Sequence, residues 1–171
     1  MSQFDLSGPL RLRQFLPPVD DSALGSLWAC ARPGWSPKTK EKKKHVSEQR
    51  VRAWLAGLPG EPPIHLVSLL GKKDNDLSEY STYDFRGRFD PEDGRPIFQE
   101  YLDQIEGRGK FIVHEFCTTD LRSVPASKLD EIVKRIWELL QLQLTVILFD
   151  SGGVGRVGQV RQRLHFQDTL S

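Results

Sequence analysis

The sequence has little cysteine, no long apolar run and no excess of charge of either sign. It contains only two cysteines among 171 residues, and their wide separation fits neither a disulfide scaffold nor a zinc site. This cysteine usage favours a reducing, cytoplasmic setting. No run approaches the roughly 18 apolar residues of a membrane span, and the N-terminus lacks the apolar core of a signal peptide, so we expect neither. With 24 basic and 23 acidic side chains, bulk charge gives no reason to expect a nucleic acid or a membrane as partner.

The composition indicates one globular domain. Apolar residues make up 38% and charged residues 27%. A chain of this length can bury a full hydrophobic core without disulfides or metal ions to stabilise it. Residues 1–26 are rich in proline, serine and aspartate, so we expect a loosely held N-terminal arm followed by a domain over residues 27–171. Five lysines lie in residues 38–44. Because no aromatic residues interleave with them, a solvated loop is expected there, with a phosphate-rich partner as the alternative.

Apolar spacing predicts an alternation of strands and helices. Such an alternation is typical of an α/β domain with a central, mostly parallel sheet flanked by helices. Trp54 and Trp137 lie on the apolar stripes of two predicted helices, so both are expected in the core. Strands are expected at residues 27–30, 64–70, 111–116 and 144–149. Helices are expected at residues 47–58, 96–105 and 127–140, the last capped by Ser127, and a short helix is expected up to Leu164.

The strand at residues 144–149 runs into a glycine-rich turn that allows three interpretations. Gly153, Gly155 and Gly158 have the spacing of a dinucleotide-binding motif, but only 13 residues follow Gly158, too few to complete that unit. An ATP- or GTP-binding loop requires lysine where Gln159 stands. The third interpretation is an anion-binding loop. Its backbone N–H groups would converge on the anion, the helix dipole would add positive potential, and the Arg156 guanidinium could hold two oxygens at once. A plain strand-to-helix turn with an exposed arginine is the alternative.

Two segments of the sequence resemble a known family. Residues 149–158 (FDSGGVGRVG) resemble the signature of the cysteine-dependent protein tyrosine and dual-specificity phosphatases, His-Cys-x-x-Gly-x-Gly-Arg-Thr-Gly. Residues 119–125 (TDLRSVP) are similar to that family's acid loop, where an aspartate precedes a proline and a long helix. The resemblance covers roughly residues 27–165. It implies a dual-specificity-phosphatase-like fold, no cofactor or metal, and a phosphorylated protein or small phosphate ester as ligand.

The resemblance also implies roles for single residues. Arg156 corresponds to the phosphate clamp, and Asp120 to the general acid that protonates the leaving oxygen. Asp150 stands at the position of the nucleophilic cysteine, which attacks phosphorus as a thiolate in that family. Phe149 replaces the family's histidine and Val157 its hydroxyl residue. The phosphate-binding amides correspond to Ser151, Gly152, Gly153, Val154 and Gly155.

These departures imply a degenerate copy of the family. The chain ends 15 residues after Arg156, where the family usually continues, so the domain is expected to be shortened at its C-terminus. We expect the Asp150 carboxylate to be stabilised as an anion by the loop amides, to occupy them and to repel a phosphate. An aspartyl-phosphate mechanism needs a metal, and no acidic cluster near the loop offers ligands for one. The sequence therefore predicts a pseudophosphatase, with an active phosphatase in which Asp150 is a mutation or artefact as the alternative.

Three further residues have a structural and a functional interpretation. Cys117 is expected to be a buried structural thiol, although its place just before the acid loop also allows it to face the site. Arg122 either assists phosphate binding or is a solvated loop arginine. His114 is expected to be a packed or edge histidine, because no second histidine or cysteine lies at ligand spacing along the sequence.

Overall fold

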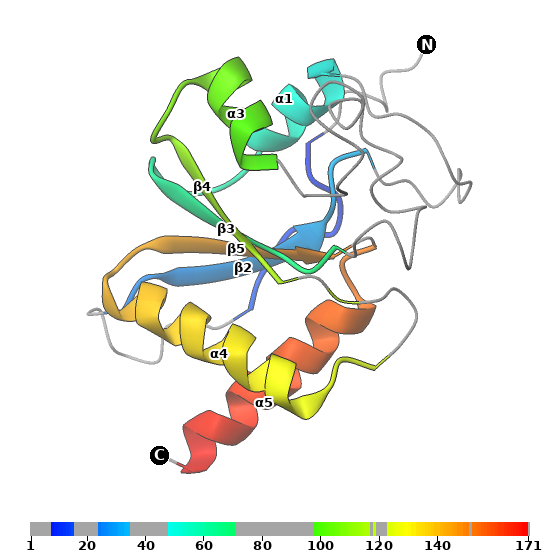
Figure 1. Ribbon diagram of the computed structural model, residues 1–171, viewed down its shortest axis with the longest axis vertical. Coiled ribbons are helices and arrows are strands. Elements are labelled where there is room, and N and C mark those ends of the chain that lie inside the picture. The colour runs from blue at the N-terminus through cyan, green and yellow to red at the C-terminus, as the bar shows by residue number, and fades with distance from the viewer. Residues whose placement is uncertain are drawn as a thin grey trace.

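One five-stranded sheet runs through the part of the chain that the computed structural model describes, namely residues 8–15, 24–34, 48–70, 98–116, 118, 123–150 and 152–170. Its strands are β1 (Arg13–Gln14), β2 (Ser26–Ala31), β3 (Ile64–Ser68), β4 (Phe111–Glu115) and β5 (Thr145–Asp150). Their order in space is β1-β2-β5-β3-β4, and only β1 is antiparallel to its neighbour. Figure 1 shows β2, β5, β3 and β4 side by side. The predicted α/β class, the mostly parallel sheet and the four predicted strands are confirmed.

Helices cover both faces of this sheet. They are α1 (Glu48–Ala56), α3 (Phe98–Glu106), α4 (Ala126–Gln141) and α5 (Gly155–Leu170). Helices α1 and α3 lie on one face, and α4 and α5 lie on the other (Figure 1). Because parallel strands need a crossover between them, each helix follows a strand or connects two strands of the sheet. The carboxyl ends of β2, β3 and β5 consequently lie at one edge, where the segment before α5 begins.

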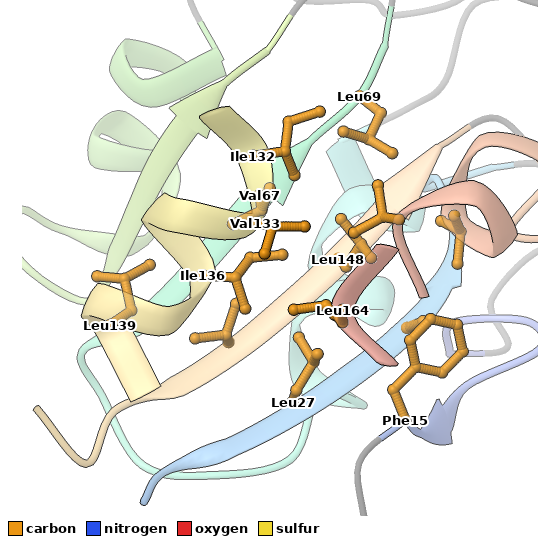
Figure 2. Close-up of a cluster of buried hydrophobic side chains, with 14 of the residues drawn as sticks. Phe15, Leu27, Val67, Leu69, Ile132, Val133, Ile136, Leu139, Leu148 and Leu164 are labelled. Atoms are coloured by element: carbon orange, nitrogen blue, oxygen red, sulfur yellow. The ribbon is translucent and has the colours of Figure 1, made fainter. Parts of the chain in front are cut away.

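Each face of the sheet has its own hydrophobic core. Towards α1 and α3, Trp54 packs edge-on against Phe149 with ring centroids 5.2 Å apart, and its Nε1 donates to the Ala31 carbonyl at 2.9 Å. Towards α4 and α5, Val67 and Leu148 of the sheet meet Leu164 and the apolar face of α4 (Figure 2). Complete burial of each large side chain contributes roughly 1.5–3 kcal/mol. Trp54 is a core residue as predicted, and Trp137 is partly buried against the second core.

The edge strand β4 is paired on its outer side by a side chain. Gln99 of α3 accepts a hydrogen bond from the Val113 amide at 2.8 Å and donates one to the Phe111 carbonyl at 2.8 Å. A second bond from the same amide nitrogen to Asp103 at 3.0 Å fixes the orientation of the Gln99 side chain. The carboxamide of Gln99 thus contacts the backbone of β4 as a neighbouring peptide group would.

The N-terminal segment differs from the expectation of a loose arm. Strand β1 pairs with β2, the Leu10 carbonyl accepts from the Ala31 amide at 2.9 Å, and Phe15 is buried in the core that faces α4 and α5. The expectation is therefore wrong for residues 8–15, because one aromatic side chain and a two-residue strand hold this segment on the sheet. Residues 24–26 of the predicted arm lead into β2, which begins at Ser26, and the Gly25 amide donates to the Leu140 carbonyl at 2.8 Å. Residues 1–7 and 16–23 lie outside the described residues, and the division at residue 27 stays a prediction.

Two other local predictions also need a correction. Helix α4 begins at Ala126 after Pro125 and has no side-chain cap, so Ser127 lies inside the first turn and does not cap the helix. Helix α5 runs for 16 residues and ends at Leu170, beyond the short helix predicted up to Leu164. The lysine-rich residues 38–44 lie outside the described residues, and both interpretations of them remain open.

A pair of histidines on neighbouring strands is a feature that sequence spacing did not reveal. His65 of β3 and His114 of β4 are half-buried, with Nδ1 of His65 2.9 Å from Nε2 of His114. Nη1 of Arg135 on α4 lies 2.9 Å from Nδ1 of His114. Because a guanidinium can only donate, Nδ1 of His114 accepts, and its Nε2–H donates to His65. The contacts therefore hold His114 as the neutral imidazole.

The histidine pair makes stability depend on pH. Burial, together with the neighbouring His65 and Arg135, lowers the pKa of His114 to about 4, whereas an unfolded histidine titrates near about 6.5. The unfolded chain therefore binds more protons between these values, so the free energy of unfolding should fall as the pH decreases from about 6.5 to about 4. Urea denaturation from pH 7 to 4.5 should show a smaller decrease for His114→Gln. Equal decreases in both proteins would contradict this assignment.

Candidate anion-binding site

The candidate site begins where β5 ends. Asp150, the last residue of that strand, is 2% exposed. Its Oδ1 accepts a hydrogen bond from the Gly153 amide, and its Oδ2 accepts one from the Val157 amide at 3.0 Å. Val157 lies in the first turn of α5, so the carboxylate sits where the helix dipole favours negative charge. Two of the amides at this turn therefore already bind an anion, which is a side chain of the same protein.

Arg156 is the second residue of α5, and its side chain points into the protein. It is 3% exposed, and its Nη1 donates to the Leu69 carbonyl and to Thr118 Oγ1, each at 2.9 Å. Thr118 Oγ1 itself donates to the Leu69 carbonyl at 2.5 Å. The guanidinium thus joins the start of α5 to the segments that follow β3 and β4. This burial rules out the alternative of a plain turn with an exposed arginine.

Gly153 holds the loop tightly against the end of β2. Its φ is +79°, and a Cβ at this position would lie 2.7 Å from the Ala31 nitrogen and 2.7 Å from the Cys30 carbonyl carbon. Only glycine fits both the left-handed backbone and the contact. In contrast, a Cβ at Gly155 or Gly158 would meet no atom within 4 Å. Among these three glycines of the motif, Gly153 is therefore the one that the local geometry requires.

Both ends of the predicted acid loop are tied to α5. Thr118, just before that loop, binds Arg156, and the amide of Val124, near the end of the loop, donates to Gln159 Oε1 on α5 at 2.8 Å. Asp120 itself, like Cys117, Arg122 and Ser151, lies outside the described residues. The meeting of Asp120 with Arg156 in one site therefore stays a prediction. Thr118 and Gln159 are two contributors that the sequence did not reveal, since neither belongs to the quoted motifs.

Cys30 lies near the loop, and its environment disfavours the thiolate form. The side chain is fully buried on the side of the sheet that faces α1 and α3. Burial raises the pKa of the Cys30 thiol, Asp150 adds to this effect, and Arg13 opposes it. A nucleophilic cysteine needs the opposite shift. Cys30 therefore does not replace the cysteine that is missing at position 150.

Two kinds of feature are absent from the described residues. They contain no group of three or more histidine, cysteine, aspartate or glutamate side chains arranged to hold a metal ion. Among the helices of the described segments, none is both long enough and apolar enough to cross a membrane.

The close contact at Gly153 leads to a stability prediction with a matched control. Gly153→Ala introduces a Cβ into both an unfavourable φ and the backbone of β2, whereas Gly109→Ala meets the same kind of φ, +86°, in open space. The control should lose about 1–2 kcal/mol, and Gly153→Ala about 2 kcal/mol more because of the steric conflict. Urea denaturation measures both variants. Equal losses would show that the loop is not pressed against β2.

Comparison with known proteins places the fold. No protein-family model matches this sequence, and the search of curated proteins found no match. Among solved structures, the chain is similar to a kinase associated phosphatase that carries serine in place of its catalytic cysteine. The two have a TM-score of 0.60 and 17% sequence identity, and the match covers 95% of this chain and 78% of that chain. The chain thus has a dual-specificity-phosphatase-like fold, as its sequence predicts.

Proposed function

We propose that this chain is a pseudophosphatase whose anion-binding loop is occupied by its own Asp150. The observation that supports the proposal is the pair of hydrogen bonds from the Gly153 and Val157 amides to the two oxygens of one buried carboxylate. In an active phosphatase of the resembling family, such amides hold the substrate phosphate. Here a phosphate group can enter only if it displaces a carboxylate that is covalently part of the loop.

The chemistry of Asp150 argues against turnover. A carboxylate that approaches a phosphate dianion is repelled, and both Asp150 oxygens already accept hydrogen bonds from the protein. An aspartyl-phosphate mechanism would also require a cation to neutralise the charge, and the described residues place no ligand cluster near the loop. Phe149 cannot assist catalysis at the loop, because its ring lies in the core that faces α1 and α3, where it packs on Trp54 and Phe98. The proposed role is therefore binding without hydrolysis.

The proposed partner is a phosphorylated protein, with a small phosphate ester as the other ligand of the same chemistry. The phosphatase-like fold supports this class of partner, because such a fold presents its loop amides at the edge of the sheet where strands end. Arg156 would supply the guanidinium for the phosphate oxygens. Asp120 would play no catalytic part while position 150 lacks a nucleophile.

The first consequence concerns hydrolysis. The purified chain should release no nitrophenol from para-nitrophenyl phosphate above the buffer background, because no thiolate is present at position 150. Asp150→Cys should restore weak activity at most, since Phe149 and Val157 do not support a thiolate. The control at the same position is Asp150→Asn, which should also be inactive. Turnover that is present in the original chain and lost in Asp150→Asn would overturn the proposal.

The second consequence concerns anion binding. Asp150→Ser should bind inorganic phosphate at least tenfold more tightly than the original chain, about 1.4 kcal/mol, because it empties the loop of its internal anion. The gain should disappear in Asp150→Ser combined with Arg156→Lys, since an ammonium cannot make the bidentate contact. Titration calorimetry measures the affinity, and the increase in melting temperature with phosphate provides an independent check. Equal affinity in the original chain and in Asp150→Ser would show that Asp150 does not compete with phosphate.

A further inference from the structure

Two arginines from the N-terminal segment contact the outer side of the loop. Nη1 of Arg11 donates to the Gly152 carbonyl at 2.9 Å, and Nη2 of Arg13 donates to the Gly153 carbonyl at 2.8 Å. These residues lie about 140 positions before the loop in the sequence. The resemblance to a phosphatase signature does not include them. They hold two successive carbonyl groups of the loop, those of Gly152 and Gly153.

The geometry of the peptide bond links the Arg11 contact directly to the anion site, and Arg13 supports Arg11 through a hydrogen bond to its carbonyl. The Gly152 carbonyl and the Gly153 N–H belong to one peptide group, and in a trans peptide they point in opposite directions. Arg11 holds the oxygen of this group, while Asp150 accepts a hydrogen bond from its N–H. A cation at one end and an anion at the other polarise the peptide in the same sense, so each hydrogen bond strengthens the other. By holding the Gly152 carbonyl, Arg11 therefore orients the Gly153 N–H toward Asp150.

We propose that Arg11 and Arg13 are positioning residues of the anion-binding loop, which orient its amides by holding its carbonyls. The inference rests on the proposed function, because it treats the loop as an anion site. It makes the N-terminal segment a part of that site. The two arginines act on the loop peptides and not directly on the bound anion.

The N-terminal segment is built to hold these arginines in place. The Arg13 guanidinium lies 5.1 Å from the centre of the Phe15 ring, and its Nη1 donates to the Arg11 carbonyl at 2.7 Å. Phe15 is 2% exposed, and Arg161 of α5 covers the same ring at 5.0 Å. Arg11 has a φ of +60°, a left-handed conformation that is uncommon for a side chain of this size. Such a backbone persists where surrounding contacts determine it, and it often accompanies a functional constraint.

The alternative explanation is that the arginines only add positive potential near the loop. A lysine at position 13 would preserve that potential but would lose the planar fork that reaches two carbonyls and stacks on Phe15. If Arg13 positions the loop, Arg13→Lys should change exchange of the Gly153 amide as much as Arg13→Gln does. If Arg13 contributes only positive potential, Arg13→Lys should leave that exchange as it is with arginine. The two explanations differ in a measurable way.

Amide hydrogen exchange in the chain with Asp150 intact tests the inference. In the original protein, the Gly153 and Val157 amides should be protected by the carboxylate. Arg11→Gln, Arg13→Gln and Arg13→Lys should each accelerate exchange at Gly153 at least tenfold relative to the core amide of Leu148, which corrects for global stability. The control Arg52→Gln, which removes an exposed arginine that contacts Glu48, should leave that ratio unchanged.

The outcomes separate this inference from the proposed function. If Gly153 is protected and the three variants do not change its ratio to Leu148, the positioning role is overturned while the occupied loop remains supported. If the Gly153 amide is unprotected in the original protein, the occupied loop fails, and the positioning role fails with it. If only the two glutamine variants accelerate exchange while Arg13→Lys does not, the arginines act through charge and the positioning role is also overturned.

Discussion

The bidentate contact between the Asp150 carboxylate and the amides of Gly153 and Val157 determines the arrangement of the site. It joins the end of the central strand β5, the glycine-rich loop and the first turn of α5 through one side chain. The negative charge lies at the positive end of the helix, and the loop amides satisfy both carboxylate oxygens. A phosphate in this loop would need the same partners. In the proposed function, the group that stabilises the fold here would therefore compete with a bound phosphate.

Arg156 is the second buried charged residue at this edge of the sheet. As a buried cation it needs several acceptors, and it finds them in the Leu69 carbonyl and Thr118. Those two residues follow β3 and β4, so the guanidinium connects the ends of two further strands to α5. Together, one buried carboxylate and one buried guanidinium connect the carboxyl ends of β3, β4 and β5 to the start of a single helix. The charged residues at this edge of the sheet thus determine how the segments that follow the strands are packed.

Sequence patterns predicted the architecture well and the details of the site less completely. The continuous apolar run before Asp150 and the apolar stripe through Ile132 and Ile136 each bury enough surface to determine a strand and a helix. The glycine spacing and Arg156 located the loop. In contrast, β1 has two residues and shows no periodicity, and the contacts of Arg11 and Arg13 join segments at opposite ends of the sequence. His65 and His114 meet only because of strand register. Features that depend on long-range register leave no local pattern in a single sequence.

The hydrogen bonds of Gln99 to β4 have a consequence for how this protein meets other chains. An exposed strand at the side of a sheet is a template on which a second polypeptide can extend the sheet, and such extension leads to misassembly. In this protein the carboxamide of Gln99 occupies an amide and a carbonyl of β4 that an incoming strand would need. An added strand would have to displace a side chain that also binds Asp103. Among the described residues, a single glutamine thus protects one amide and one carbonyl of this outer strand from pairing with another chain.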